Sequence, residues 1–207
     1  MKTRVRKAVI PAAGYGTRFL PIAKSVPKEM LPLVDRPVIQ YVVEEAVASG
    51  IEDILIVISR SKRSLEEHFH PAPELEAELE IKGRLEELSA LRSLSSLARI
   101  HYIWQAKMGG LGDAILHARD HVGQDPFAVL LGDTVTTTTD TARPLTRQLA
   151  DLVEAQGGSA VALQEVPAEK VSRYGILGGS EVAPGAIPRS EDRSEEHTSE
   201  LQSPCNL

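Results

Sequence analysis

A loop near the N-terminus carries the first residues whose types and spacing could do chemistry. Gly14 and Gly16 follow an apolar run at residues 8–13, and Thr17 and Arg18 come directly after them. A glycine tolerates positive φ, and because it has no Cβ its backbone N–H can approach an anion closely. The guanidinium of Arg18 presents a fixed fork of donors that matches phosphate oxygens. This combination predicts a phosphate-binding loop.

A second charged segment follows this loop. Lys28 and Glu29 stand between Pro27 and Pro32, and the prolines disfavour a helix there. We therefore expect Lys28 on a loop, where its ammonium can meet a polyphosphate. Each segment by itself has an ordinary interpretation: a structural turn for the glycines, and a solvated surface residue for Lys28. Their succession favours the phosphate site.

Two better-known phosphate-binding loops are excluded. A dinucleotide-binding fingerprint needs a third glycine where this chain has Arg18, and Pro21 and Pro27 interrupt the helix that should follow. A P-loop needs glycine, lysine and then serine or threonine, whereas residues 16–18 are glycine, threonine and arginine. The loop is therefore of another kind.

Two more polar residues follow apolar segments. Asp133 comes after Gly132 at the end of the run 127–131. Mg²⁺ takes one or two carboxylates together with phosphate oxygens and water, and Asp133 suits that role, although a simple turn would also use an aspartate. Gln105 follows the alternating segment 100–104, and its amide offers both a donor and an acceptor to a ligand.

Two histidines have a spacing that zinc can use. His117 and His121 are four residues apart in one expected helix. No glutamate follows the first histidine directly, and no third ligand is evident in the sequence. We therefore expect a solvated pair rather than a metal site.

The elements that must position these residues alternate along the chain. Strands are expected at residues 8–13, 51–58, 100–104, 127–131 and 160–166. Helices are expected at residues 38–49, 60–69, 73–92, 112–121 and 144–156, and Asp35 is expected to cap the first of them. Such alternation predicts an α/β fold with a mainly parallel sheet and helices on both faces. Because ligands bind at the carboxyl ends of such strands, Gly14, Gln105 and Asp133 should share one rim.

Composition narrows the function classes. The 207 residues can form one sizeable core, and a net charge of −6 without a basic stripe speaks against binding of nucleic acid. No apolar run approaches the ~20 residues of a membrane helix, so no membrane partner is expected. Cys205 is the only cysteine, which excludes an intrachain disulfide and fits a cytoplasmic protein.

The last residues differ from the rest. Residues 190–207 are polar and lack an apolar period, and residues 193–203 resemble the in-frame translation of a sequencing-library adapter. We expect a catalytic domain at residues 1–189, incomplete at its C-terminus, and a disordered, artefactual tail at residues 190–207. An ordinary disordered tail is the alternative.

The stretch at residues 7–41, in which KAVIPAAGYGTRFLP precedes PKEMLP, resembles the signature of the sugar-1-phosphate nucleotidylyltransferases. The resemblance extends to about residue 177. It implies a Rossmann-like three-layer α/β/α nucleotidyltransferase fold, an Mg²⁺ cofactor, and UTP and glucose 1-phosphate as the substrates. Enzymes of the same family that make dTDP-glucose or GDP-mannose, and a non-catalytic nucleotide-sensing homologue, are the alternatives.

The resemblance also implies roles for single residues. It makes Arg18 and Lys28 catalytic, Asp133 the metal ligand, and Tyr174 and Gly175 the substrate contacts. The nucleotide-binding residues that it implies are Ala13, Gly14, Gly16, Thr17, Glu29, Gln105 and Gly110.

The chain departs from the family pattern in two places. Many relatives have a second acid after the metal-binding aspartate, where this chain has Thr134, and the family's Glu-Lys-Pro sugar-binding segment is absent. We therefore expect this chain to bind the nucleotide without turnover, and the full-length protein to be a homo-oligomer.

Overall fold

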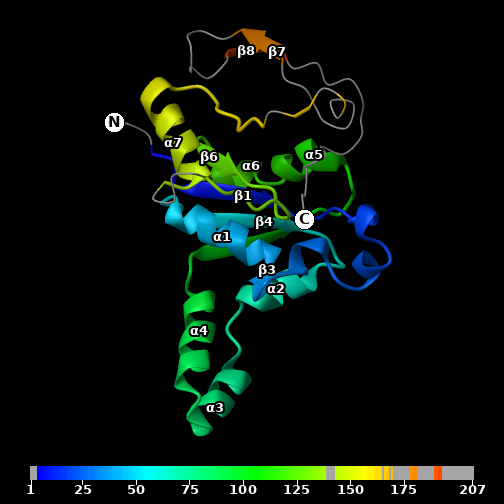
Figure 1. The fold of residues 1–207 in the computed structure, drawn as a ribbon, viewed down its shortest axis with the longest axis vertical. Helices are drawn as coiled ribbons and strands as arrows, with labels where there is room; N and C mark the ends of the chain where they lie inside the picture. The colour runs from blue at the N-terminus through cyan, green and yellow to red at the C-terminus, as the bar shows by residue number, and fades with distance from the viewer. Residues whose placement is uncertain are drawn as a thin grey trace. The chain divides into compact units, whose positions relative to one another are not determined.

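The computed structural model describes residues 4–138, 143–164, 166–167, 169, 178–180 and 189–192. The chain divides into two compact units, Met1–Ala162 and Leu163–Leu207. The first unit holds the sheet and all the helices named below (Figure 1). The predicted substrate contacts Tyr174 and Gly175 lie outside the described residues.

Four parallel strands form the sheet of the first unit. They are β1 (Lys7–Pro11), β4 (Asp53–Ile58), β5 (Arg99–Trp104) and β6 (Phe127–Val129), in the order β5-β4-β1-β6. The central strands β1 and β4 are buried almost throughout, whereas the edge strands alternate between more and less exposed residues. A continuous apolar run is typical of a strand covered on both faces. The predicted parallel α/β sheet is confirmed.

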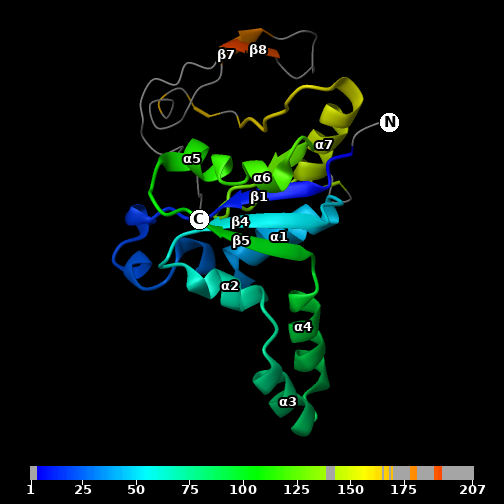
Figure 2. The same cartoon turned by 180° about the vertical axis from the view of Figure 1, so that it is seen from behind.

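Helices cover both faces of this sheet. On one face lie α1 (Val38–Ala48), α2 (Arg63–Phe69) and α7 (Leu145–Gln156), which pack on Ile10, Ile54 and Ile56. On the other face lie α5 (Gly110–Leu116) and α6 (Arg119–Val122), which pack on Val9 and Leu55. The described part of the chain therefore forms the predicted three-layer α/β/α arrangement (Figures 1 and 2).

Short elements connect β1 to α1. Three 3₁₀ turns, η1 (Thr17–Phe19), η2 (Ile22–Lys24) and η3 (Lys28–Met30), precede a small hairpin of β2 (Pro32–Leu33) and β3 (Arg36–Pro37). The proline-rich segment thus forms no α-helix, as expected.

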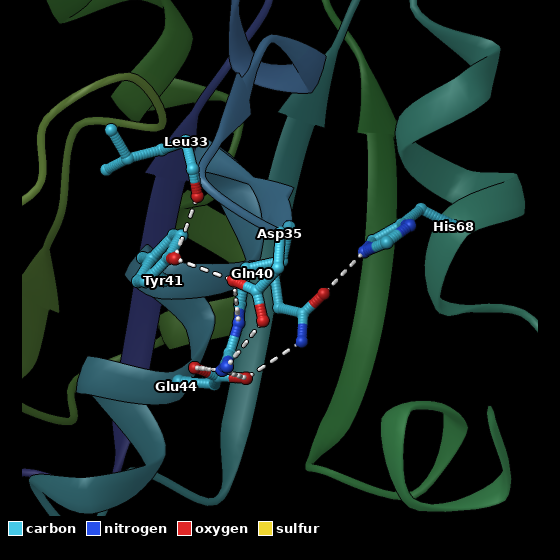
Figure 3. Close-up of polar contacts among 7 residues, drawn as sticks. Leu33, Asp35, Gln40, Tyr41, Glu44 and His68 are labelled. Carbon is cyan, nitrogen blue, oxygen red and sulfur yellow. Dashed lines mark hydrogen bonds and ion pairs between the residues drawn. The ribbon is translucent and has the colours of Figure 1, made fainter. Parts of the chain in front are cut away.

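Polar contacts fix the hairpin against the helices (Figure 3). The Tyr41 hydroxyl donates to the Leu33 carbonyl at 2.8 Å and also lies 3.2 Å from a carboxylate oxygen of Asp35. Gln40 of α1 lies 3.1 Å from the ring of His68 in α2. Asp35 stays in the hairpin turn and makes no cap, because the N-cap position belongs to Pro37; the predicted cap is wrong.

A helical hairpin replaces the single helix predicted at residues 73–92. α3 (Pro73–Ile81) and α4 (Leu85–Ser95) are separated at Gly83, whose φ of 68° no helix can contain. Leu79 and Leu88 are buried, whereas Leu75 and Leu85 are exposed. The hairpin projects away from the sheet in both views (Figures 1 and 2).

The second unit contains one described pair of strands, β7 (Gly178–Ser180) and β8 (Arg189–Asp192), which are antiparallel. Residues 190–192 of the expected tail lie in β8, and residues 193–207 lie outside the described residues. The strand predicted at residues 160–166 is not found at its described positions, where Val161 and Leu163 are exposed. No helix in the described ranges is long and apolar enough to cross a membrane.

Candidate functional site

The carboxyl ends of the strands bring three predicted residues to one rim. Gly14 follows β1, Gln105 follows β5 and Asp133 follows β6. The Gln105 N–H donates to the Ile58 carbonyl at the end of β4, and the Gly132 N–H donates to the Pro11 carbonyl at the end of β1. Because β1 lies between β4 and β6, the glycine loop is central on this rim. The three residues therefore lie at one edge of the sheet, as predicted.

Lys28 and Asp133 meet across this rim. The Lys28 ammonium lies 2.8 Å from a carboxylate oxygen of Asp133, and both side chains are mostly buried. Gly16 adjoins the same lysine: a Cβ added there would lie 3.4 Å from the Cγ and Cδ of Lys28. Gly16 also has a φ of 65°, in the left-handed region that favours glycine. The structure thus brings the glycine loop, the lysine and the carboxylate together.

A buried ion pair holds the segment that carries Lys28. The Lys62 ammonium donates to both carboxylate oxygens of Glu29, at 2.7 and 2.6 Å, and the two side chains are 4% and 1% exposed. Burial raises the pKa of Glu29 and lowers the pKa of Lys62, while the opposite charge of the partner counteracts each shift. The carboxylate of Glu29 is therefore engaged below the rim.

Gly132 allows the end of β6 to approach this segment. A Cβ added at Gly132 would lie 3.2 Å from the Cβ of Ala12 and 3.4 Å from the Cγ of Glu29. A side chain at this position would be in tight contact with Ala12 and Glu29, so glycine favours the close approach.

Gln105 is buried at the other end of the rim. Its amide nitrogen donates to a carboxylate oxygen of Asp113 at 2.6 Å and to the Gly110 carbonyl at 3.3 Å. A Cβ at Gly109 would fall within 2.8 Å of the Asp113 side chain, so the glycine makes room for this contact. Gln105 and Gly110, both predicted to contact the nucleotide, are thus held together.

The remaining predicted residues have distinct settings. Thr17 and Arg18 are exposed in η1, and Ala13 is buried where the chain leaves β1. His117 bonds the carbonyl of Asp113, whereas His121 bonds a carboxylate oxygen of Asp53 in β4, so the two histidines have different partners.

Asp133 fits a magnesium ion by the chemistry of its donor atoms. It offers carboxylate oxygens at 20% side-chain exposure beside the loop expected to bind phosphates. Mg²⁺ needs only one or two protein carboxylates when phosphate oxygens and water complete its shell. Thr134, the next residue, adds no second carboxylate.

Two residues of the rim escaped prediction from the sequence. Lys62 holds Glu29, and Asp113 holds Gln105. A usable signal for Lys62 was its place just after β4, at the same carboxyl edge as the other candidates. Asp113 follows several glycines, and these glycines indicate the start of a helix but not the contact with Gln105.

A parallel sheet whose carboxyl rim carries a glycine turn, a lysine and a carboxylate defines an α/β protein that is suited to a phosphorylated ligand. The chain belongs to the nucleotidyl transferase family, whose sequence profile matches residues 7–183.

Curated relatives narrow the comparison. The UTP–glucose-1-phosphate uridylyltransferase of Bacillus subtilis (strain 168) is 53% identical over 174 residues, which cover 84% of this chain and 59% of that protein. The enzyme of the same name from Streptococcus pneumoniae serotype 4 is 51% identical over 178 residues, which cover 86% of this chain and 59% of that protein. The chain thus spans 59% of the length of each of these relatives.

Solved structures agree with the fold. A UTP-bound UGPase from Acinetobacter baumannii has a TM-score of 0.82 at 38% identity, covering 86% of this chain and 63% of that one. A UDP-glucose pyrophosphorylase complexed with UDP-glucose has a TM-score of 0.75 at 41% identity, covering 86% and 64%. The resemblance and the nucleotidyltransferase fold expected from the sequence are confirmed.

Proposed function

We propose that this chain forms the nucleotide-binding part of an enzyme that makes UDP-glucose and pyrophosphate from UTP and glucose 1-phosphate. The relatives described above carry that activity in their names, and solved relatives hold UTP or UDP-glucose. The observation that carries the proposal is the ion pair of Lys28 and Asp133 beside the left-handed Gly16. It puts a cation, a carboxylate and an exposed backbone at one strand edge.

The proposed reaction joins two anions. A phosphate oxygen of glucose 1-phosphate attacks the α-phosphorus of UTP, the bond to the β-phosphate breaks, and pyrophosphate leaves with the electron pair. Charge repulsion and positioning dominate such a barrier, so the protein needs cations and N–H donors rather than a nucleophile. Backbone N–H groups of Ala13, Gly14, Gly16 and Thr17 would cradle the triphosphate. Arg18 and Lys28 would neutralise charge on the departing pyrophosphate.

Asp133 would hold the magnesium ion in this scheme. When bound, Mg²⁺ would supply positive charge that offsets the negative charge of the triphosphate. The carboxylate of Asp133 would then pair with the metal instead of Lys28, and the Lys28 ammonium would pair with the phosphates. We propose this exchange of partners as the change that accompanies nucleotide binding.

Gln105 and Gly110 would contact the base. Since the Gln105 side chain donates from its amide nitrogen to Asp113 and Gly110, we assign its amide oxygen to accept the N–H of the uracil imide. Glu29, expected among the nucleotide-binding residues, would act through Lys62 by fixing η3. Tyr174 and Gly175 keep their proposed role at the sugar.

The experiment measures binding and turnover by the 207-residue chain. We expect calorimetry to show UTP binding in the presence of Mg²⁺, no added affinity with glucose 1-phosphate, and no pyrophosphate release. Apart from Tyr174 and Gly175, the sugar-phosphate subsite is assigned to the part of the relatives that this chain does not cover. Pyrophosphate release would overturn that assignment, and absence of UTP binding would overturn the proposed function.

Two alternatives are separated by the same titration. Tighter binding of dTTP or GTP than of UTP would favour an enzyme of dTDP-glucose or GDP-mannose synthesis. A non-catalytic nucleotide sensor would bind UTP equally well with or without Mg²⁺, since it needs no metal for chemistry. For the full-length protein we propose a homo-oligomer in the cytoplasm.

A further inference from the structure

A cluster of two histidines and one aspartate lies away from the rim described above. Asp53 is the first residue of β4, His101 the third residue of β5, and His121 belongs to α6. Gln105 follows the opposite end of β5, so the cluster sits toward the amino ends of the strands. It therefore belongs to another part of the molecule than Gly14 and Asp133.

The strand register explains why these side chains converge. Asp53 pairs with Arg99 and Leu55 pairs with His101 in parallel strands. Residues two apart along a strand share a face, so Asp53 and His101 point to the same side of the sheet. That side is the one covered by α5 and α6, because Leu55 packs against Val122 in the same cluster of buried residues. α6 on this side contributes His121.

The distances within the cluster suit a transition metal. One ligand atom from each residue lies within 4.8 Å of the other two. An Asp53 oxygen is 2.9 Å from the His121 Nε2 and 3.6 Å from the His101 Nε2. Ligands at ~2.0–2.2 Å from a tetrahedral zinc ion lie about 3.4 Å apart. The distance from Asp53 to His121 is slightly shorter than this spacing, and the distance from Asp53 to His101 is slightly longer.

The three side chains differ in exposure, and the most exposed one can move to complete the site. Asp53 and His121 are 18% and 24% exposed, whereas His101 is 52% exposed. The rings of the two histidines are 5.0 Å apart at centroid and tilted by 56°. The exposed ring of His101 can therefore rotate toward a shared ion while the other two ligands stay in place.

The neighbouring cation is already engaged. The Lys7 ammonium donates to the carbonyls of His121 and Val122 and pairs with Asp125 at 2.8 Å. Its charge is thus directed to the end of α6 rather than to the imidazole nitrogens. A metal ion at the cluster would meet one carboxylate and two neutral imidazoles, a donor set that zinc prefers.

We propose that Asp53, His101 and His121 form a zinc site that fastens α6 to β4 and β5. The ion takes the place of the proton shared by the His121 Nε2 and Asp53, which is released to solvent, and water completes the coordination shell. The site is separate from the magnesium position assigned to Asp133, and its role is structural. This proposal does not depend on the proposed function.

The test titrates zinc alone into the metal-free 207-residue chain against a chromophoric chelator, with Cys205→Ser in every protein to remove the thiol. We expect one equivalent to bind and the melting temperature to rise with zinc concentration. His101→Gln and His121→Ala should each weaken binding by more than the roughly 10–100-fold that loss of a supporting partner costs. Cobalt should give the intense visible bands of a four- or five-coordinate ion.

His117→Gln is the matched control, because this histidine lies one turn before His121 and bonds a backbone carbonyl. It should bind zinc like the parent protein. His101→Gln covers the case in which His121→Ala fails to fold, because the His101 side chain is half-exposed. The proposal is overturned if no zinc binds, or if zinc binds equally to the His101→Gln and parent proteins, which would show an adventitious ion only.

Discussion

Lys28 and Asp133 neutralise each other at the rim, so a nucleotide must compete with an existing ion pair. Their contact is 2.8 Å, with 24% and 20% side-chain exposure. At this exposure, solvent screens the attraction between the two charges more than it would in a fully buried ion pair, but does not screen it completely. In the proposed scheme, Lys28 would exchange Asp133 for the phosphates and Asp133 would exchange Lys28 for the metal.

Replacing Lys28 tests the cationic half of this pair. Lys28→Ala should weaken UTP binding in the presence of Mg²⁺ by about 10–100-fold, the equivalent of a charged hydrogen bond worth ~1.5–3 kcal/mol. Isothermal titration calorimetry of the 207-residue chain measures it. Lys24→Ala is the control, because Lys24 is an exposed lysine of the same segment. Equal losses in the two variants would show a general charge effect rather than a site.

Replacing Asp133 tests the metal-binding half. In the parent protein UTP affinity should rise when Mg²⁺ is added, because the ion bridges the carboxylate and the phosphates. Asp133→Asn keeps the shape but loses the charge, and its UTP affinity should no longer respond to Mg²⁺. Calorimetry with and without EDTA gives the comparison. An unchanged magnesium response in Asp133→Asn would place the metal elsewhere.

At the scale of elements, short turns rather than long helices set the geometry of the rim. Three 3₁₀ turns and a two-stranded hairpin carry the chain from β1 to α1. Leu20, Ile22 and Val34 in this segment are exposed rather than packed in the core, so its position depends largely on polar contacts and on backbone conformation. Single substitutions in them should therefore separate effects on folding from effects on the ligand.

The two glycines of the loop should behave differently when replaced by alanine. Gly16 has positive φ and adjoins Lys28, so Gly16→Ala should cost about 1–2 kcal/mol of unfolding free energy and weaken UTP binding as well. Gly14 has nothing within 4 Å of an added Cβ. Gly14→Ala should leave stability unchanged and weaken only UTP binding, because the methyl group would meet the ligand. Urea denaturation and calorimetry separate the two, and a stability loss in Gly14→Ala would contradict this account.

The buried pair beneath the rim should matter for folding. Lys62→Met leaves the Glu29 carboxylate buried without its partner and should lower the unfolding free energy by about 3–5 kcal/mol. The double variant Glu29→Gln with Lys62→Met removes both charges, so it should be more stable than Lys62→Met alone. Urea denaturation of the parent, Glu29→Gln, Lys62→Met and double-variant proteins completes the cycle. Additive losses would show that the pair is not coupled.

The limits of sequence reasoning follow from what each element depends on. The strands β1 and β4 were predictable because burial on both faces leaves a continuous apolar run, and this in turn located Gly14 and the rim. The split at Gly83 was missed because the leucines on both sides keep a helical period. Partners such as Lys62 for Glu29 depend on contacts 33 residues apart, which a local pattern does not encode.

At the scale of the whole molecule, the α3–α4 hairpin is a separate projection whose contribution to the site can be tested. It joins the sheet core through Leu94 and Leu97. Its own packing relies on Leu79 and Leu88, and on Arg92, which bonds Glu76 across the two helices at 3.0 Å. Glu76 lies near the start of α3 and Arg92 near the end of α4, so their contact brings these two ends together. The residues from 77 to 91 can therefore be replaced by a short turn.

Replacing residues 77–91 by a four-residue Gly-Ser turn should leave UTP binding unchanged within about twofold, because none of the rim residues lies in the hairpin. The unfolding free energy should fall only slightly, since Leu94 and Leu97 stay in place against the core. Calorimetry gives the affinity, and light scattering on a sizing column gives the mass of both proteins. A smaller number of chains per particle with normal UTP affinity would identify the hairpin as a contact between copies of the chain. A tenfold loss of UTP affinity would instead show that the hairpin is coupled to the rim through α2, and the separation argued here would be wrong.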